Sequence, residues 1–194
     1  MDFFPDYFEK IRECLKREPV ESLKAVTELI RATQERRGKV ILVGNGGSAA
    51  MASHVAVDLT KAAGVRAIDF NEADLLTCLA NDYGYEHWVE KALEFYGDEH
   101  DLVILISSSG KSANIVNGAK KARQLGMRVV TLSGFSAENP LRALGEVNLW
   151  VDSQMYNIIE MTHHIWLLAI ADYCIASLQS SDRRPKRLAA SATV

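Results

Sequence analysis

Two stretches of the sequence carry acid and base side chains at the spacing of one helical turn. His54 and Asp58 are four residues apart, as are Glu160 and His164, and side chains four residues apart share one face of a helix. Proton transfer between adjacent carbon atoms needs a base at the carbon and an acid or a metal at the oxygen. Brought together, the two pairs predict such a transfer, or a nitrogen-and-oxygen site suited to zinc or a similar divalent ion.

Both pairs also have a purely structural interpretation. A His–Asp pair on an exposed helix face is often a surface hydrogen bond, and this alternative stays open for His54 and Asp58. Glu160 and His164 lie in an otherwise apolar segment, where a charge without a partner is costly. This second pair therefore favours a functional role.

A glycine-rich segment follows the first short apolar run. It reads GNGGS (residues 44 to 48) and precedes a predicted helix that begins near Ala49. Glycines let a backbone approach an anion closely, and a helix N-terminus favours negative charge, so the segment predicts a phosphate loop. The same letters fit a dinucleotide fingerprint with Asp69 at the end of the next run, so a nicotinamide-binding fold is an alternative.

A second donor-rich segment, SSSGKS (residues 107 to 112), follows the third apolar run. A strand that merely turns into a helix needs only one capping serine, so four hydroxyls predict a cup for an anion. A P-loop would need a glycine five positions before Gly110, where Leu105 stands, and this excludes a nucleoside triphosphate site. A dinucleotide fold has no use for this second cup. A phosphorylated sugar is therefore the preferred ligand.

The elements that must position these residues follow from the apolar pattern. Continuous rather than alternating apolar strands are buried on both faces, which indicates an α/β fold with a parallel sheet covered by helices. Both donor-rich segments would then lie at the carboxyl edge of the sheet, where such folds bind ligands. The five predicted strands are KVILVG (39 to 44), VRAIDF (65 to 70), DLVILIS (101 to 107), MRVVTLS (127 to 133) and VNLWVD (147 to 152).

The chain divides into three predicted parts. Residues 1–37 form two antiparallel helices with a break near Pro19 that pack on the main domain, residues 38–179 form that domain, and residues 180–194 form a disordered tail. The last helix, about residues 157–178, is apolar nearly all round. Such a helix must be buried in its own domain or against another subunit, so we expect a homo-oligomer, most simply a tetramer.

Composition narrows the class of protein. The 194 residues, 48% of them hydrophobic, suit one domain with a full core. The formal charge of -3 offers no basic excess for nucleic acid. Three widely spaced cysteines suit reduced thiols in the cytoplasm, and the sequence shows neither a signal peptide nor a predicted membrane span.

Four segments of the sequence occur together: GNGGSAA (44 to 50), LANDYGY (79 to 85), ISSSGKSANIV (106 to 116) and VVTLSGF (129 to 135). Together they resemble the SIS (sugar isomerase) family, and within it the phosphoheptose isomerase branch. The similarity extends over about residues 5–178. It implies a flavodoxin-like domain in a homotetramer with active sites at subunit interfaces, and conversion of sedoheptulose 7-phosphate into a heptose 7-phosphate without a nucleotide cofactor.

The resemblance also implies which residues bind the substrate. They are Asn45, Gly46, Gly47, Ser48, Ser107, Ser108, Ser109, Lys111 and Ser112. Their serines other than Ser108 would hold the phosphate, and Asn45 would lie near the sugar. Ser108 stands where the family has Thr. Lys111 stands where the family usually has Asn, which adds a charge within reach of the phosphate.

The implied proton-transfer residues depart from the family pattern. The family has a His and, four residues later, a Glu base, where this chain has His54 and the shorter Asp58. On the last helix the family's general-acid His is replaced by Leu168. The predicted catalytic residues are therefore Asp58, as the base, with His164 or His163 in place of the acid. The predicted metal ligands are His54, Asp58, Glu160 and His164.

These departures also support a second hypothesis. With an altered base and without the usual acid, the chain would be a non-catalytic SIS module that binds a phosphosugar or a protein. Members that associate with the bacterial replication initiator are similar in this respect. Aldose–ketose exchange on a sugar phosphate distinguishes the two hypotheses.

Overall fold

A five-stranded parallel sheet forms the centre of the molecule, as the sequence predicts. The computed structural model describes residues 2–17 and 20–182, the last five of these as backbone only. The strand order is β2-β1-β3-β4-β5, and every neighbouring pair is parallel. Every residue of β1 and β3 is buried, because helices cover both faces. The strands are β1 (Val40–Val43), β2 (Ala67–Ile68), β3 (Leu102–Ser107), β4 (Arg128–Ser133) and β5 (Val147–Trp150).

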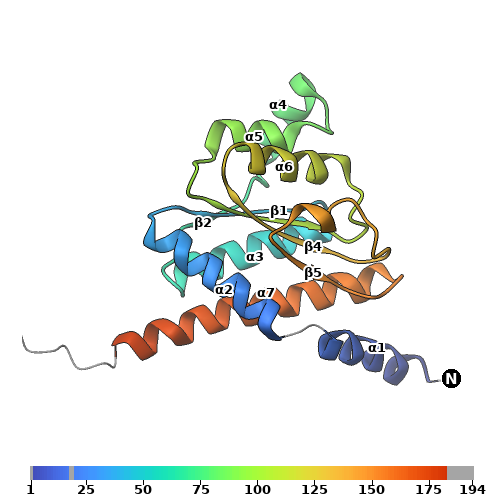
Figure 1. Ribbon diagram of the computed structural model, residues 1–194. Coiled ribbons are helices and arrows are strands. Elements are labelled where there is room, and N and C mark those ends of the chain that lie inside the picture. Colours follow the sequence, from blue (N-terminus) through green and yellow to red (C-terminus); the bar gives the residue numbers. More distant parts are fainter. Residues whose placement is uncertain (1, 18–19, 183–194) are drawn as a thin grey trace, which may run out of the picture.

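Helices cover the two faces of the sheet in separate layers (Figure 1). Alternate strand residues point to opposite faces, so Val40 and Leu42 belong to one core and Ile41 and Val43 to the other. The first core is closed by α2 (Val20–Glu35), α3 (Gly47–Lys61) and α7 (Tyr156–Asp182). The second is closed by α4 (Ala73–Tyr83), α5 (Trp88–Tyr96) and α6 (Ala113–Gln124), with the short 3₁₀ turn η1 (Arg142–Leu144) beside it.

The N-terminal helices α1 (Phe3–Arg17) and α2 are present, but the predicted antiparallel arrangement is wrong. Each helix packs against α7, and Figure 1 shows one following the other along it. In α1 only one side reaches the core, through Cys14 and the partly buried Tyr7, Ile11 and Leu15. That side meets α7, so α1 extends beyond the sheet instead of folding back on α2.

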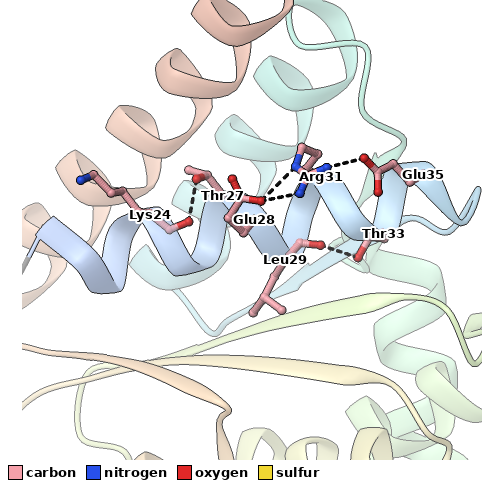
Figure 2. A network of polar contacts seen from close by, with 7 residues as sticks. All are labelled: Lys24, Thr27, Glu28, Leu29, Arg31, Thr33 and Glu35. Carbon is pink, nitrogen blue, oxygen red and sulfur yellow. Dashed lines mark hydrogen bonds and ion pairs between the residues drawn. The ribbon is translucent and has the colours of Figure 1, made fainter.

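Helix α2 shows how an outer helix combines a polar face with a buried one. Figure 2 shows Arg31 between Glu28 and Glu35 on the outer face, with ion pairs to both. The buried hydroxyls of Thr27 and Thr33 donate to backbone carbonyls of the preceding turn, so neither is left unpaired in the core. These two hydroxyls therefore need no partner outside the helix.

The long helix α7 begins one residue before the predicted segment and extends to Asp182. Its stretch Tyr156–Ser177 is long and apolar enough to cross a membrane by length and composition. Here it packs against α1, α2 and α3, and Ile158, Ile159, Trp166 and Leu167 belong to the first core. Of the predicted disordered tail, residues 180–182 are helical, and 183–194 lie outside the described residues.

The amino edge of the sheet is closed by a buried ion pair. Lys39 Nζ lies 2.6 Å from Asp101 Oδ2, and the Lys39 amide donates to Asp101 Oδ1 at 2.8 Å. Asp101 is 1% exposed and also accepts from the Asp98 amide. Since both carboxylate oxygens have protein partners, this edge is structural, and the carboxyl edge is the one that can hold a ligand.

Candidate active site

The two donor-rich loops meet at the carboxyl edge of the sheet, as predicted. One joins β1 to α3 and the other joins β3 to α6, and β1 and β3 are neighbours. Between the loops lies a cavity of about 160 Å³, which we call the serine cup. The cup is lined by Asn45, Ser48, Ile106, Ser107, Ser108, Ser109, Ser112, Tyr156 and Glu160.

The hydroxyls of the cup are held inside the protein. Ser48, Ser107 and Ser108 are between 3% and 6% exposed. The Ser107 hydroxyl donates to Ser112 Oγ at 3.0 Å, and the Lys111 amide donates to Ser109 Oγ at 3.2 Å, whereas the Lys111 side chain is exposed. The turn needs Gly110 at φ +64°, because a side chain there would collide with Asn139.

The N-terminus of α3 opens into the same cup. Its N-cap residue is Gly46, at φ +54°, which supplies no side-chain cap for the first amides of the helix. Uncapped amides and the positive end of the helix dipole favour an anion. Gly47 has no room for a side chain, because a Cβ atom there would lie 2.5 Å from Glu160 Oε2.

Helix α7 adds two residues to the cup that the sequence did not assign to it. Glu160 was predicted as a metal ligand, yet its carboxylate turns towards the cup, where the Ser108 hydroxyl lies 3.5 Å from Oε1. Tyr156 lies one turn earlier on the same face. The four-residue spacing from Glu160 was the available signal for Tyr156, once Glu160 was known to face the phosphate loops.

The acid and base side chains form a row beside the cup, from α3 to α7. Asp58 Oδ2 lies 3.4 Å from His54 Nε2, and His54 Nδ1 lies 3.0 Å from His164 Nε2. The two imidazole rings meet edge to face at 83°. Burial, and secondly the charge of His54, hold the pKa of His164 below its usual range. The row joins a carboxylate to two imidazoles that can share a proton.

The other predicted acid, His163, lies elsewhere. It is fully buried, and its Nε2 is 3.1 Å from the carbonyl oxygen of Ser133. Burial lowers the pKa of His163 to about 4, so the ring is neutral near pH 7 and donates its Nε2 proton to that carbonyl. Leu168 packs against the first core. Of the two histidines, the structure therefore brings His164 to the row and gives His163 a packing position.

The four predicted metal ligands do not converge in the described part of the chain. Glu160 faces Ser108, whereas His54 and His164 face each other, and residues 2–17 and 20–182 contain no group of three His, Cys, Asp or Glu side chains that could hold an ion. Nitrogen atoms directed at one another share a proton, whereas a metal site needs lone pairs directed at a common point. The residues thus do not fit an ion as they stand.

A larger cavity of about 250 Å³ lies between α2 and α7, away from both loops. Glu28 and Arg31, which line it, are already paired with each other, as Figure 2 shows. Apolar side chains, among them Ile30, Ala63 and Val65, also line it. The smaller serine cup, with its hydroxyls and helix N-terminus, is the better candidate for a charged ligand.

Comparison with known proteins agrees with this geometry. The SIS domain model matches residues 4–134. A protein of Helicobacter pylori strain P12 called phosphoheptose isomerase is 35% identical over 161 residues, covering 80% of this chain and 83% of that protein. The structure of a phosphoheptose isomerase from Neisseria gonorrhoeae superposes with a TM-score of 0.81 at 30% identity, covering 89% of this chain and 95% of the other.

A second solved structure extends the likeness of the fold. A phosphoheptose isomerase from Francisella tularensis has the same TM-score of 0.81 at 24% identity, covering 90% of this chain and 95% of the other. Residues 4–134, which the SIS domain model matches, include both loops of the serine cup and strands β1 to β4. By its sequence and its fold, this chain belongs to the SIS (sugar isomerase) domain family.

Proposed function

We propose that the protein is an isomerase that interconverts the ketose and aldose forms of a sugar phosphate, with sedoheptulose 7-phosphate as its substrate. The observation that carries this proposal is the Asp58–His54–His164 row beside an uncapped, serine-lined cup. The same two helices supply both parts, because α3 and α7 also bring Ser48 and Glu160 to the cup. The relatives called phosphoheptose isomerase support this choice of substrate.

The cup would hold the phosphate, and the sugar would extend along α3. Hydroxyls of the cup and the first amides of α3 donate to the phosphate oxygens. From Ser48 to His54 the helix rises about 9 Å, a length comparable with that of an extended seven-carbon chain. A phosphate in the cup therefore brings the carbonyl end of the sugar to the row.

The row would move the proton. Asp58 takes a proton from C1 of the ketose while His164 donates one to the carbonyl oxygen at C2, which gives an enediol. The enediol hydroxyl at C1 then returns a proton to His164, and Asp58 delivers its proton to C2, which gives the aldose. Both groups end as they began. His54, between them, holds the imidazole of His164 in place.

A direct test uses sedoheptulose 7-phosphate in deuterated water. We expect wild-type protein to form the aldose and to exchange the proton at C1, and Asp58→Asn to reduce both rates by about 10²- to 10⁴-fold. Asp74→Asn, on the distant helix α4, is the control. Binding of the sugar phosphate without any exchange would contradict the proposal and leave the non-catalytic module as the function.

A second copy of the chain would complete the site. The side chains of His54 and Asp58 are 51% and 37% exposed, whereas an enediol is protected best where water is excluded. The helices that carry the row also have exposed apolar residues: Val57 on α3, and Met161 and Ile165 on α7. These surfaces support a homo-oligomer, which we propose to be a tetramer in the cytoplasm.

The predicted Zn²⁺ or other divalent ion remains a separate proposal. Two imidazoles and a carboxylate have the donor chemistry for it, although they do not converge in the structure. Elemental analysis of the purified wild-type protein tests it. A stoichiometric metal that is lost in His54→Ala would support this proposal, and a wild-type protein free of metal yet active would refute it.

A further inference from the structure

One loop at the rim of the serine cup has no part in the function proposed above. Residues 84–87 join α4 to α5 and come close to the serine cup through Tyr85, whose hydroxyl donates to Asn45 Oδ1 at 3.1 Å. The Tyr85 side chain is exposed, at 52%, in contrast to the buried serines of the cup. The contact therefore lies at the outer rim of the cup, where the ligand beyond its phosphate would pass.

Asn45 is held from its other side by an asparagine of α6. Asn45 Nδ2 donates to Asn114 Oδ1 at 3.1 Å, and Asn114 Nδ2 donates back to Asn45 Oδ1 at 2.8 Å. Asn114 is only 2% exposed, so this reciprocal pair is fixed in the protein interior. Asn45 Oδ1 thus accepts two hydrogen bonds, one from Asn114 and one from Tyr85.

The same helix also fixes the loop that carries Tyr85. Asn117, one turn after Asn114 on the same face of α6, donates from Nδ2 to the carbonyl oxygen of Glu86 at 3.0 Å. The loop itself is a tight turn, in which the His87 amide donates to the Gly84 carbonyl and Gly84 adopts φ +89°. Two asparagines of α6 therefore join the Tyr85 loop and the Asn45 loop into one unit.

A reciprocal amide pair alone leaves the direction of its dipoles open. If both asparagine amides rotate by 180°, oxygen and nitrogen exchange places and both hydrogen bonds form again. The Tyr85 hydroxyl can donate or accept, and in the structure it donates to Asn45 Oδ1. In that orientation both lone-pair sites of Asn45 Oδ1 are used, and Nδ2 retains an N–H that the described residues leave without an acceptor.

We propose that Tyr85 is a positioning residue, which fixes Asn45 so that its free N–H faces the ligand and donates to a neutral sugar oxygen beyond the phosphate. This inference rests on the proposed function for the identity of the ligand. It gives the outer rim of the cup a preference for a hydroxyl or carbonyl oxygen at that place. Inorganic phosphate, which fills only the inner cup, does not use the contact.

The test is a double-mutant cycle on the full-length protein. The probes are inorganic phosphate and a heptitol 7-phosphate, which has no carbonyl and cannot isomerise, and calorimetry measures their affinities for wild type, Tyr85→Phe, Asn45→Ala and the double variant. We expect Tyr85→Phe to weaken heptitol 7-phosphate by about five- to tenfold and inorganic phosphate not at all. In the Asn45→Ala background, Tyr85→Phe should have no further effect.

Tyr83→Phe is the matched control, because it removes the same hydroxyl two residues away, where the ring lies beneath the Lys91 amine at 5.1 Å. It should leave both affinities unchanged. An equal loss for both probes, no loss for either, or the same loss with and without Asn45 would overturn the inference. Turnover of sedoheptulose 7-phosphate by wild type, measured in parallel, tests the proposed function separately, since the cycle depends on binding alone.

Discussion

At the scale of single residues, the serine cup contains a negative charge that repels the proposed phosphate. The Glu160 carboxylate lies beside Ser108 and against Gly47, at the N-terminus of α3, where an anion would otherwise bind. Carboxylate and phosphate repel each other at this range. A carboxylate near the α3 amides partly occupies the position that the phosphate needs. The exposed Lys111, in the second loop of the cup, carries a positive charge that can offset this repulsion.

Replacing Glu160 by Gln keeps the shape of the side chain and removes its charge. We expect inorganic phosphate to bind about three- to tenfold more tightly to Glu160→Gln than to wild type, because the repulsion is gone. Calorimetry at fixed ionic strength measures this. Glu99→Gln, an exposed site at the amino edge of the sheet, is the control. Unchanged binding would show that the Glu160 carboxylate moves away without cost, and weaker binding would contradict the repulsion.

Loss of His164 should separate chemistry from binding. We expect His164→Ala to reduce turnover by about 10²- to 10⁴-fold, because it removes the proposed acid, while the affinity for inorganic phosphate stays the same. His100→Ala, an exposed histidine before β3, is the control. Equal turnover in His164→Ala and wild type would assign the acid role to another group.

Residue types and local spacing predicted which two loops carry the donors of the serine cup, because each loop has its donors within six consecutive residues. They also predicted that His54 and His164 could meet. They missed Tyr85, Asn114 and Tyr156, whose contacts with the site arise only when α4, α6 and α7 pack around the sheet. A single tyrosine in a loop, such as Tyr85, or a single asparagine in a helix, such as Asn114, carries no sign of such a partner. Tyr156 had one signal, its position four residues before Glu160.

At the scale of secondary-structure elements, α7 contains a buried histidine that makes the free energy of unfolding depend on pH. His163 is fully buried with its pKa lowered to about 4, whereas in the unfolded chain a histidine titrates near pH 6.5. Between these values the unfolded state binds the proton and the folded state does not. The free energy of unfolding therefore falls as the pH decreases from about 6.5 to about 4, by roughly 3 kcal/mol for this group.

This gives a prediction for the element. Denaturant unfolding of wild type at pH 7 and at pH 5 should show the decrease, and His163→Gln, whose amide can still donate to the Ser133 carbonyl, should lack most of it. His100→Gln is the exposed control. An identical pH dependence in His163→Gln and wild type would show that other groups account for the acid sensitivity.

Elements were predictable where burial determines the sequence pattern. The continuous apolar strands identified the five-stranded parallel sheet, because both of its faces are covered. The arrangement of α1 was not predictable, since its apolar side, with Tyr7 and Ile11, suits α7 as well as it suits α2. The amphipathic pattern of a helix shows that one face is buried, but the tertiary structure decides which element covers that face.

At the scale of the whole molecule, apolar surface remains that one chain does not cover. Phe3, Phe4 and Phe8 on α1 are 63% to 66% exposed, and Met161 and Ile165 on α7 exceed 40%. Figure 1 shows α1 extending beyond the sheet along the side on which α7 lies. Large exposed apolar patches of this kind mark subunit interfaces. Because Met161 and Ile165 flank His164 on the helix, the same interface would cover the proton-transfer row.

The oligomer and the activity should therefore be lost together. Light scattering at micromolar concentration should give wild type a mass of four times the chain's 21.5 kDa. Ile165→Glu places a charge in the proposed interface and should lower both the mass and the turnover, with little change in phosphate affinity or in secondary structure by circular dichroism. Leu125→Glu, at the end of α6 on the other face of the sheet, is the control. A wild-type protein that is monomeric and fully active would refute the interface, and the row would then work in contact with water.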